Sequence, residues 1–348
     1  MALYYAPAVF AYLLGKCFRV KDQSTTKTTM GRISDIVSNI GMLATAVIGI
    51  FAVLWYPFYH YRESPEQSVV DVMSPILQRI FPFNRGLFEG KVANLWCVAA
   101  LKPLSIRDHI PEELQPLYAL ALTLVMMLPF CILLFQIGRR GRKMVVSNSN
   151  GGGGEESSRG HIKALLVGAA GTSLSFFLAS FQVHEKSILL PLAPLSLMSL
   201  GGNSDDFRET ILPWFTIVCT WSLWHLLVVD RLQMAYFATM VIYLCYLFYC
   251  SSHRNGQGIA KDHSHWVVQK TKQIFMKLVF PGSLLAMAGL HLMEAFIVPP
   301  LSLPDIFPVL WIVVGCACFI IIWMASLMDL WILSREVEVR AGNKDKYD

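Results

Sequence analysis

The most constraining feature of this sequence is a series of long apolar runs separated by short polar segments. The longer runs hold about 18–25 residues with few or no charges, which is enough helix to cross roughly 30 Å of hydrocarbon. Across the 348 residues, 55% are hydrophobic and 15% are charged, whereas soluble domains carry about 25% charged residues. Too little polar surface remains to cover a water-soluble globule, so we expect an all-α polytopic membrane protein.

The apolar runs predict nine membrane segments. They cover residues 2–18, 36–59, 114–137, 162–182, 187–200, 210–229, 232–250, 274–298 and 307–333. The first and fifth segments are short, which indicates partial or broken helices. Because the segments follow one another closely, we expect a single transmembrane domain over residues 1–348.

Basic residues gather after the first, third and seventh runs, as they do in the cytosolic loops of membrane proteins. This pattern places residues 60–113, 183–186 and 299–306 together on the opposite, lumenal face and the C-terminus in the cytosol. Lys344 and Lys346 stand fifth and third from the C-terminus, as in a dilysine signal for return to the endoplasmic reticulum. We therefore expect an endoplasmic-reticulum membrane protein whose net charge of +5 sets its orientation and does not indicate nucleic-acid binding.

Residues 138–161 contain a low-complexity stretch rich in glycine, serine and asparagine. A glycine-rich loop that cradles phosphate is an alternative, but no Gly-Lys-Ser/Thr follows the glycines. The composition therefore predicts a flexible cytosolic linker.

The first of two polar clusters on the predicted lumenal face covers residues 81–97, where charged and amide side chains mix with aromatic ones. A loop that rests on the lipid headgroups would explain this mixture. The alternative is a loop that binds sugar and phosphate. In that interpretation the contacts are Arg85 and Lys91 to phosphate oxygens, Glu89 and Asn94 to sugar hydroxyls, and Trp96 to a sugar face.

The second cluster lies at residues 182–187, where His184, Glu185 and Lys186 follow one another between two apolar runs. Ionisable groups at a membrane boundary indicate a functional site by default. A metal site is the alternative, but adjacent residues point in different directions on a helix, and no His-x-x-x-His or Glu-x-x-His is nearby. The histidines at 263 and 265 make an equally weak case, so we expect neither a metal nor another cofactor.

Two motifs in these clusters resemble a known family. Arg-Gly-Leu-Phe-Glu-x-Lys-Val-Ala-Asn-x-Trp-Cys at 85–97 and Phe-Gln-Val-His-Glu-Lys-Ser-Ile-Leu at 181–189 closely resemble the endoplasmic-reticulum glucosyltransferases that use dolichyl-phosphate glucose. Tyr-Leu-Leu-Gly-Lys-Cys at 12–17 is also similar to these proteins. The first motif favours the branch that adds the first glucose, because the sister branch that adds the second shares only the His-Glu-Lys triplet.

Two departures from the family pattern affect the chemistry. Gly90 stands where members usually carry Asp, so one carboxylate is lost from the loop. The resemblance also begins partway into the family's chain, and Met1 lies almost directly against an apolar run, as if earlier spans were missing. Since the family's acidic first lumenal loop belongs to that earlier part, we expect the general base to lie outside this chain, with Glu89 as the only substitute in the motif.

The resemblance implies a GT-C fold and an inverting transfer of glucose from dolichyl-phosphate glucose to dolichyl-pyrophosphate-linked Man9GlcNAc2, with an α-1,3 bond. Lys186, His184 and Arg85 would stabilise the departing phosphate without a metal, while Glu185 would orient Lys186 or bind the acceptor. Three alternatives remain open: an inactive fragment that binds dolichyl phosphate or a partner, the sister glucosyltransferase, and a transporter. A transporter is the weakest of these, because the sequence shows no persuasive repeat and its charges gather at the edges of the loops.

Overall fold

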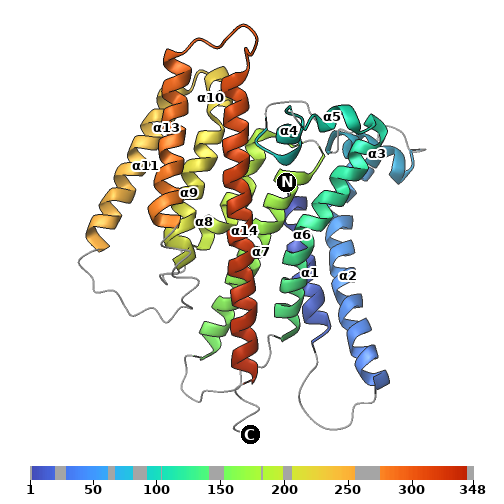
Figure 1. The fold of residues 1–348 in the computed structure, drawn as a ribbon. Helices are drawn as coiled ribbons and strands as arrows, with labels where there is room; N and C mark the ends of the chain where they lie inside the picture. Colours follow the sequence, from blue (N-terminus) through green and yellow to red (C-terminus); the bar gives the residue numbers. More distant parts are fainter. Residues whose placement is uncertain are drawn as a thin grey trace.

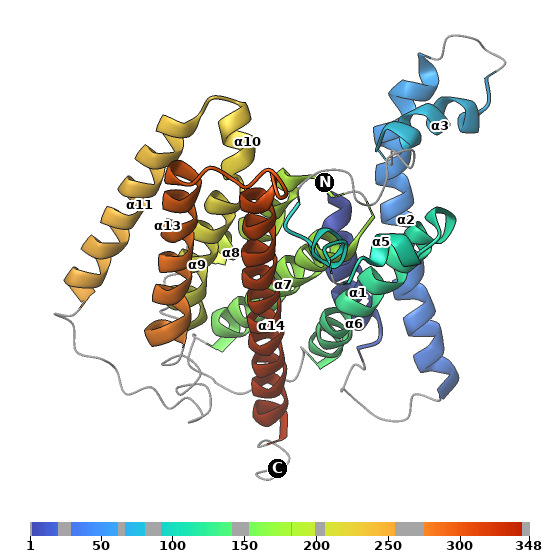
Figure 2. The same cartoon turned by 45° about the horizontal axis from the view of Figure 1, so that its top comes forward.

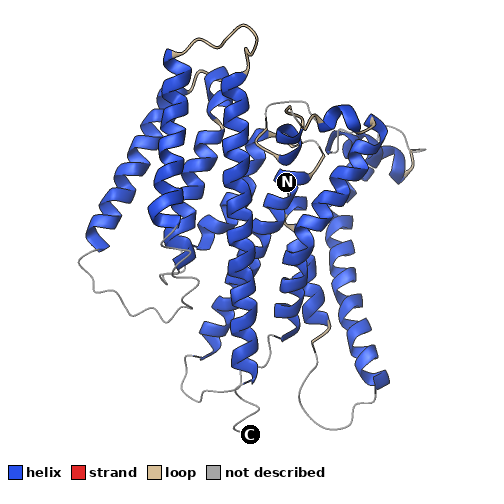
Figure 3. Cartoon of the chain, in the orientation of Figure 1, coloured by secondary structure: helices blue, strands red, loops and turns tan. Residues whose placement is uncertain are grey.

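The computed structural model describes residues 2–19, 29–61, 67–80, 92–102, 104–140, 153–181, 183–198, 206–254 and 275–342. Within these ranges every regular element is a helix, and no β-strand is present (Figure 3). The prediction of an all-α protein is therefore confirmed.

The helices follow the apolar runs closely. In chain order they are η1 (Ala2–Tyr4), α1 (Ala6–Cys17), α2 (Thr29–His60), α3 (Val69–Ile80), α4 (Leu95–Ala99), α5 (Ile106–His109), η2 (Glu112–Leu114), α6 (Gln115–Arg140), α7 (Gly153–Ala179), η3 (Glu185–Ile188), α8 (Leu189–Met198), α9 (Asp206–Ser222), α10 (Trp224–Val229), α11 (Gln233–Arg254), η5 (Phe275–Val279), α13 (Phe280–Phe296) and α14 (Ile306–Gly342). Here η5 is a short π-helix that leads directly into α13.

All nine predicted membrane segments are helical. Five of these helices are long and apolar enough to cross a membrane, namely α2, α6, α7, α13 and α14. The 12 residues of α1 and the 10 of α8 extend only about 18 and 15 Å at 1.5 Å per residue. The two segments predicted to be short are thus confirmed as partial spans, and the segment at 210–229 is divided between α9 and α10 at Leu223.

The connections alternate between the two ends of the helix bundle. One end, uppermost in Figure 1, carries α3, α4, α5, α10 and the connection between α13 and α14. The opposite end carries the last turn of α1, the first turn of α2, the adjoining ends of α6 and α7, and the C-terminal part of α14. The described parts of the three segments predicted to share one face lie at the first of these ends, which we call the site end.

Helix α7 forms the centre of the bundle, where it packs against α1, α6, α8 and α14. Small side chains dominate its buried face: Ala164, Gly168, Ala169, Ala170, Gly171, Thr172 and Ser173. A Cβ atom at Gly171 would meet the ring of Phe130 on α6, and one at Gly168 would meet Leu134. Because lipid tails are as apolar as leucine, helices in a membrane associate through such close packing.

Polar contacts also join α7 to α14 within the bundle. The indole N–H of Trp323 donates to Ser175 Oγ at 2.8 Å. Nearer the opposite end, Lys163 Nζ lies 3.9 Å from Asp329 Oδ1, and both side chains are largely buried. Such pairs satisfy polar groups that would be costly to leave alone in hydrocarbon.

Helix α2 stands at the edge of the structure, and its main packing contacts among the described elements are with α1 and α3 (Figures 1 and 2). None of its most apolar window is buried, against 72% of that of α7. The contrast separates a peripheral membrane helix from a central one.

The segment between α2 and α6 is itself partly helical. Ser68 precedes α3, and the Asp71 carboxylate accepts hydrogen bonds from the Ser68 N–H and hydroxyl groups at 2.9 and 2.7 Å. The Asp71 N–H donates back to Ser68 Oγ at 3.3 Å. This reciprocal capping box fixes where α3 begins.

The predicted linker at 138–161 was too long at both ends, because α6 continues to Arg140 and α7 already begins at Gly153. Extending an existing helix adds a hydrogen bond for each residue fixed, so helices can continue into sequences of weak propensity. Residues 141–152 lie outside the described residues.

The packing of α1 against α6 depends on two glycines. A Cβ atom at Gly15 would meet the backbone carbonyl of Phe135, and one at Gly138 would meet that of Tyr12. We expect Gly138→Ala to lower the free energy of unfolding by about 1–3 kcal/mol, since backbone must shift to admit the methyl group. Apparent Tm values of the purified chain in detergent measure the effect.

Gly49→Ala on α2 is the matched control, because nothing lies within 4 Å of a Cβ atom at that position. The added methyl group favours helix there, so its Tm should stay unchanged or rise. Equal Tm values for the two variants would contradict close packing of α1 on α6.

Candidate functional site

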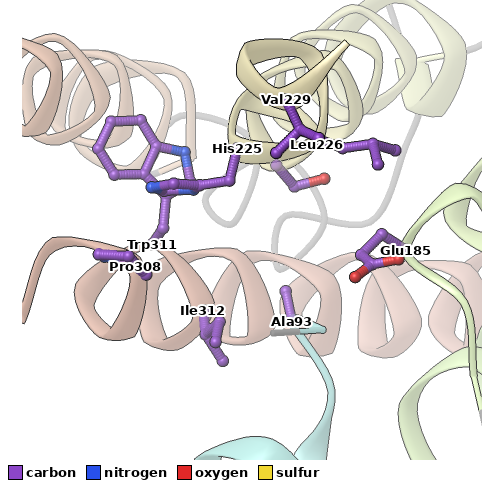
Figure 4. A pocket seen from close by; sticks show the side chains of 9 residues that line it. Ala93, Glu185, His225, Leu226, Val229, Pro308, Trp311 and Ile312 are labelled. Atoms are coloured by element: carbon purple, nitrogen blue, oxygen red, sulfur yellow. The ribbon is translucent and has the colours of Figure 1, made fainter. Parts of the chain in front are cut away.

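A cavity of about 180 Å³ lies at the site end of the bundle (Figure 4). Its lining comes from five parts of the chain: Ala93 just before α4, Glu185 on η3, Ser222 at the end of α9, His225, Leu226 and Val229 on α10, and Pro308, Trp311 and Ile312 on α14. Most of these side chains are apolar and three are polar. Ligand pockets typically combine apolar walls with a few placed polar groups, which makes this cavity the candidate site.

The His184–Glu185–Lys186 triplet forms the turn that enters η3. His184 is the N-cap residue, and its Nδ1 accepts the backbone N–H of Lys186 at 3.2 Å. The same nitrogen lies 3.1 Å from Glu185 Oε2, to which it donates when it carries a proton. The next two residues, Ser187 and Ile188, are buried and anchor the turn.

The three side chains of the triplet point to different places. Glu185 lines the cavity and is 30% exposed, whereas His184 is 58% exposed and Lys186 is also exposed. A phosphate group at the surface could therefore meet Lys186 and His184 while the group attached to it enters the cavity beside Glu185.

The opposite wall contains an ionisable pair that the sequence interpretation missed. His225 Nε2 on α10 lies 3.3 Å from Glu294 Oε1 on α13. The other carboxylate oxygen of Glu294 accepts the indole N–H of Trp224 at 2.8 Å. The signal that could have found them is the presence of ionisable residues inside apolar runs, with His225 in 210–229 and Lys277, His291 and Glu294 in 274–298.

Trp311 of α14 stiffens the same wall. It stacks on Trp221 with 4.7 Å between ring centroids and 11° between ring planes, and its N–H donates to the Trp221 carbonyl at 3.1 Å. His225 and His291 meet the indole edge-on, with centroids at 5.1 and 4.9 Å. Since Tyr236 Oη and His291 Nε2 are 2.8 Å apart, hydrogen bonds extend the wall to α11.

Two residues predicted to bind sugar form hydrogen bonds within the protein instead. Asn94 is buried and caps α4, with Oδ1 accepting the Cys97 N–H at 2.9 Å. Trp96 is also buried, and its indole N–H donates to the Ala179 carbonyl at the end of α7 at 2.7 Å. Both side chains therefore hold α4 in place, and the proposals below do not depend on them.

The remaining residues of the first cluster, Arg85, Glu89, Gly90 and Lys91, lie outside the described residues. Among the residues that the structure does describe, no group of three His, Cys, Asp or Glu side chains is arranged to hold a metal ion. The histidines at 263 and 265 also fall outside the described ranges. Metal-independent chemistry stays a prediction.

The environment of Cys97 links α4 to the carboxylate in the cavity. Burial raises the pKa of the Cys97 thiol, a backbone hydrogen bond with Val92 partly offsets this, and the negative charge of Glu185 raises the pKa further. Glu185 therefore acts electrostatically on α4 as well as on the cavity.

These features define a polytopic helical membrane protein with one polar face and a cavity at that face. The model of the ALG6, ALG8 glycosyltransferase family matches residues 1–325, so the chain belongs to this family. The family resemblance inferred from the motifs is thereby confirmed, and with it a polytopic helical fold of the GT-C type.

Relatives in several organisms carry the same description. A Schizosaccharomyces pombe protein named probable dolichyl pyrophosphate Man9GlcNAc2 alpha-1,3-glucosyltransferase is 30% identical over 347 residues, which cover 99% of this chain and 56% of that protein. Proteins named dolichyl pyrophosphate Man9GlcNAc2 alpha-1,3-glucosyltransferase are 33% identical in Pongo abelii, over 92% of this chain and 56% of the relative, and 29% identical in Saccharomyces cerevisiae, over 95% and 55%. The chain thus spans about half the length of these relatives.

Labelling of Cys97 tests the placement of Glu185. Because the thiolate is the reactive form, a raised pKa slows alkylation by N-ethylmaleimide at about pH 8. Glu185→Gln removes the negative charge, lowers the thiol pKa and should increase the labelling rate several-fold, as measured by mass spectrometry of the Cys97 peptide.

The rate for Glu185→Gln should still stay below that of a free thiol, since burial is the larger cause of the raised pKa. Glu113→Gln, at an exposed carboxylate in η2, serves as the control and should leave the rate unchanged. An identical rate in the two variants would place Glu185 too far from Cys97.

Proposed function

We propose that this chain transfers glucose from dolichyl-phosphate glucose to dolichyl-pyrophosphate-linked Man9GlcNAc2, forming an α-1,3 bond with inversion. The family match and the names of the relatives support the proposal. The structural observation that carries it is the pairing of an exposed Lys186 and His184 with a cavity lined by Glu185 on the same turn. A sugar joined to a phosphate matches this arrangement, because the phosphate can bind Lys186 and His184 while the sugar enters the cavity.

Lys186 and His184 are proposed to bind the phosphate of the donor, together with Arg85. Hydrogen-bond donors, of which Lys186 and Arg85 are cationic, stabilise the charge that builds on phosphate as the glycosidic bond breaks, which is an electrostatic contribution to the rate. The backbone of Lys186 is held by His184 Nδ1, so the turn that presents the ammonium group has a defined geometry.

Glu185 is proposed to contact the substrate. From the sequence it could equally have oriented Lys186, but its carboxylate lines the cavity and its near partner is His184. The general base that deprotonates the acceptor hydroxyl is assigned to no described residue. Glu89, the substitute suggested by the motif, lies outside the described ranges.

We also propose that the site end faces the lumen of the endoplasmic reticulum and that the C-terminus is cytosolic. The basic segments at the opposite end support this orientation through the positive-inside rule. Both lipid-linked substrates would then meet the protein at the membrane surface where the triplet lies.

Binding without transfer is the second candidate function. It is favoured by the chemistry of the described site, in which phosphate-binding groups are present and no described residue is assigned as the general base of transfer. In this case the chain would hold dolichyl phosphate or its glucosylated form without completing the reaction.

One assay separates the two functions. The purified chain in nanodiscs receives dolichyl-phosphate [³H]glucose and the lipid-linked Man9GlcNAc2 acceptor, and label in the released oligosaccharide is counted. Label that enters the oligosaccharide and is then released by an α-1,3-specific glucosidase would establish the glucosyltransferase activity. Saturable donor binding without transfer would establish the binding protein. If the chain shows neither transfer nor donor binding, both candidate functions are refuted.

Lys186→Ala should weaken the affinity for both dolichyl-phosphate glucose and dolichyl phosphate. Loss of a hydrogen bond from a charged group costs about 1.5–3 kcal/mol, which corresponds to roughly 10- to 100-fold in Kd. Equilibrium binding with radiolabelled lipids measures the change, and Lys186→Arg should restore much of the affinity.

Lys102→Ala is the matched control, because Lys102 is an exposed lysine in the same connection that carries α4 and α5. Its removal should leave both affinities unchanged. A Kd for Lys186→Ala within about twofold of the control would remove Lys186 from the phosphate site.

The proposed chemistry is independent of divalent metal. Charge on the departing phosphate is stabilised by side chains, so EDTA should leave glucose transfer, or donor binding if transfer is not observed, unchanged. Addition of Mg²⁺ or Mn²⁺ after EDTA tests for recovery. A loss that either ion reverses would show that a metal takes part.

A further inference from the structure

The cavity has polar groups at two ends and apolar side chains between them. Figure 4 shows Glu185 on one side and His225 beside Trp311 on the other. The remaining wall is formed mainly by Leu226, Ile312 and other apolar residues. A ligand that fills this space must therefore offer hydrogen-bonding groups at opposite edges.

The cavity also lies next to the proposed phosphate position. Glu185 and Lys186 are consecutive residues of η3, and the first lines the cavity while the second is exposed beside it. When a phosphate is held at Lys186, the group attached directly to that phosphate is the one within reach of the cavity. In the proposed donor that group is a hexose.

We infer that this cavity is the subsite for the donor hexose, in which His225 contacts the sugar hydroxyls and Glu294 is the positioning residue that orients His225. The inference rests on the proposed donor and deepens it. This subsite involves residues of α10 and α13, which lie outside the two sequence motifs at 85–97 and 181–189.

The cavity has room for a sugar. Its volume of about 180 Å³ is well above the ~10–15 Å³ that one water molecule needs on the same measure. Glu185, Ser222 and His225 place polar groups among its apolar walls. The hydroxyl groups around a sugar ring can form hydrogen bonds to several of them at once, which an isoprenoid chain cannot do.

The Glu294 carboxylate lies behind the His225 ring. One carboxylate oxygen meets His225 Nε2 at 3.3 Å and the other accepts from Trp224 at 2.8 Å, so the carboxylate is held from two sides. The edge of the Trp311 indole, at 5.1 Å between centroids, limits rotation of the imidazole. A carboxylate behind an imidazole sets its tautomer and orientation, as it does for ligand-binding histidines generally.

The test compares dolichyl-phosphate glucose with dolichyl phosphate on the full chain in nanodiscs. The ratio of their Kd values isolates the contribution of the sugar. In the parent chain, hydrogen bonds to the sugar that together contribute about 1–1.4 kcal/mol should make the glucosylated lipid bind roughly 5- to 10-fold more tightly.

His225→Leu should bring this ratio close to one while leaving the Kd for dolichyl phosphate unchanged. Glu294→Gln, which can still accept the Trp224 N–H, should reduce the ratio in part. Lys186→Ala should weaken both lipids equally and keep the ratio. His109→Leu, an exposed histidine of α5, is the matched control and should change neither value.

Val229→Trp provides a second route if His225→Leu lowers the Tm, because Val229 lines the cavity but is 78% exposed and tolerates a larger side chain. By filling the cavity it should also abolish the ratio. An unchanged ratio in both variants, or an equal loss for both lipids, would overturn the subsite.

The two proposals fail separately. A ratio that depends on His225 without glucose transfer would sustain the subsite and refute the enzyme activity. Glucose transfer with a ratio independent of His225 would do the reverse.

Discussion

Close contact between helix backbones is the constraint on which the rest of this structure depends. Hydrocarbon offers helices no hydrophobic reason to associate, so the small residues along α7 and the glycines between α1 and α6 supply the packing surface. The central helix then positions the site directly. Its last residue, Ala179, accepts the hydrogen bond of Trp96 and so locates α4, and the next turns of chain lead into η3.

The candidate site joins two parts of the bundle that are remote in sequence. One part is the α7–η3 junction, which carries the triplet, and the other is the group of α10, α13 and α14, tied together by Glu294 and Trp311. The break between α9 and α10 at Leu223 matters here, because it lets Trp224 and His225 approach α13 and α14. Substrate chemistry at the surface is thus connected to packing inside the membrane.

Much of this architecture could be predicted from the sequence, because length and hydropathy alone determine which segments can cross a bilayer. The shared face of 60–113, 183–186 and 299–306 followed from the basic loops. The inward orientation of Asn94 and Trp96 could not be predicted, because a loop of polar and aromatic residues has the same sequence pattern whether it caps a helix or binds a ligand. The pairing of His225 with Glu294 was also missed, because 69 positions separate them and only the packing of α10 on α13 brings them together.

The stacked pair of Trp221 and Trp311 has a consequence for observing this protein. Two nearly parallel indoles with centroids 4.7 Å apart couple their electronic transitions, so a change in their relative orientation alters the near-ultraviolet circular dichroism. One ring of the pair lines the cavity and the other is fixed to it by a hydrogen bond. The wall of the cavity therefore contains a spectroscopic reporter of its own geometry, without any added label.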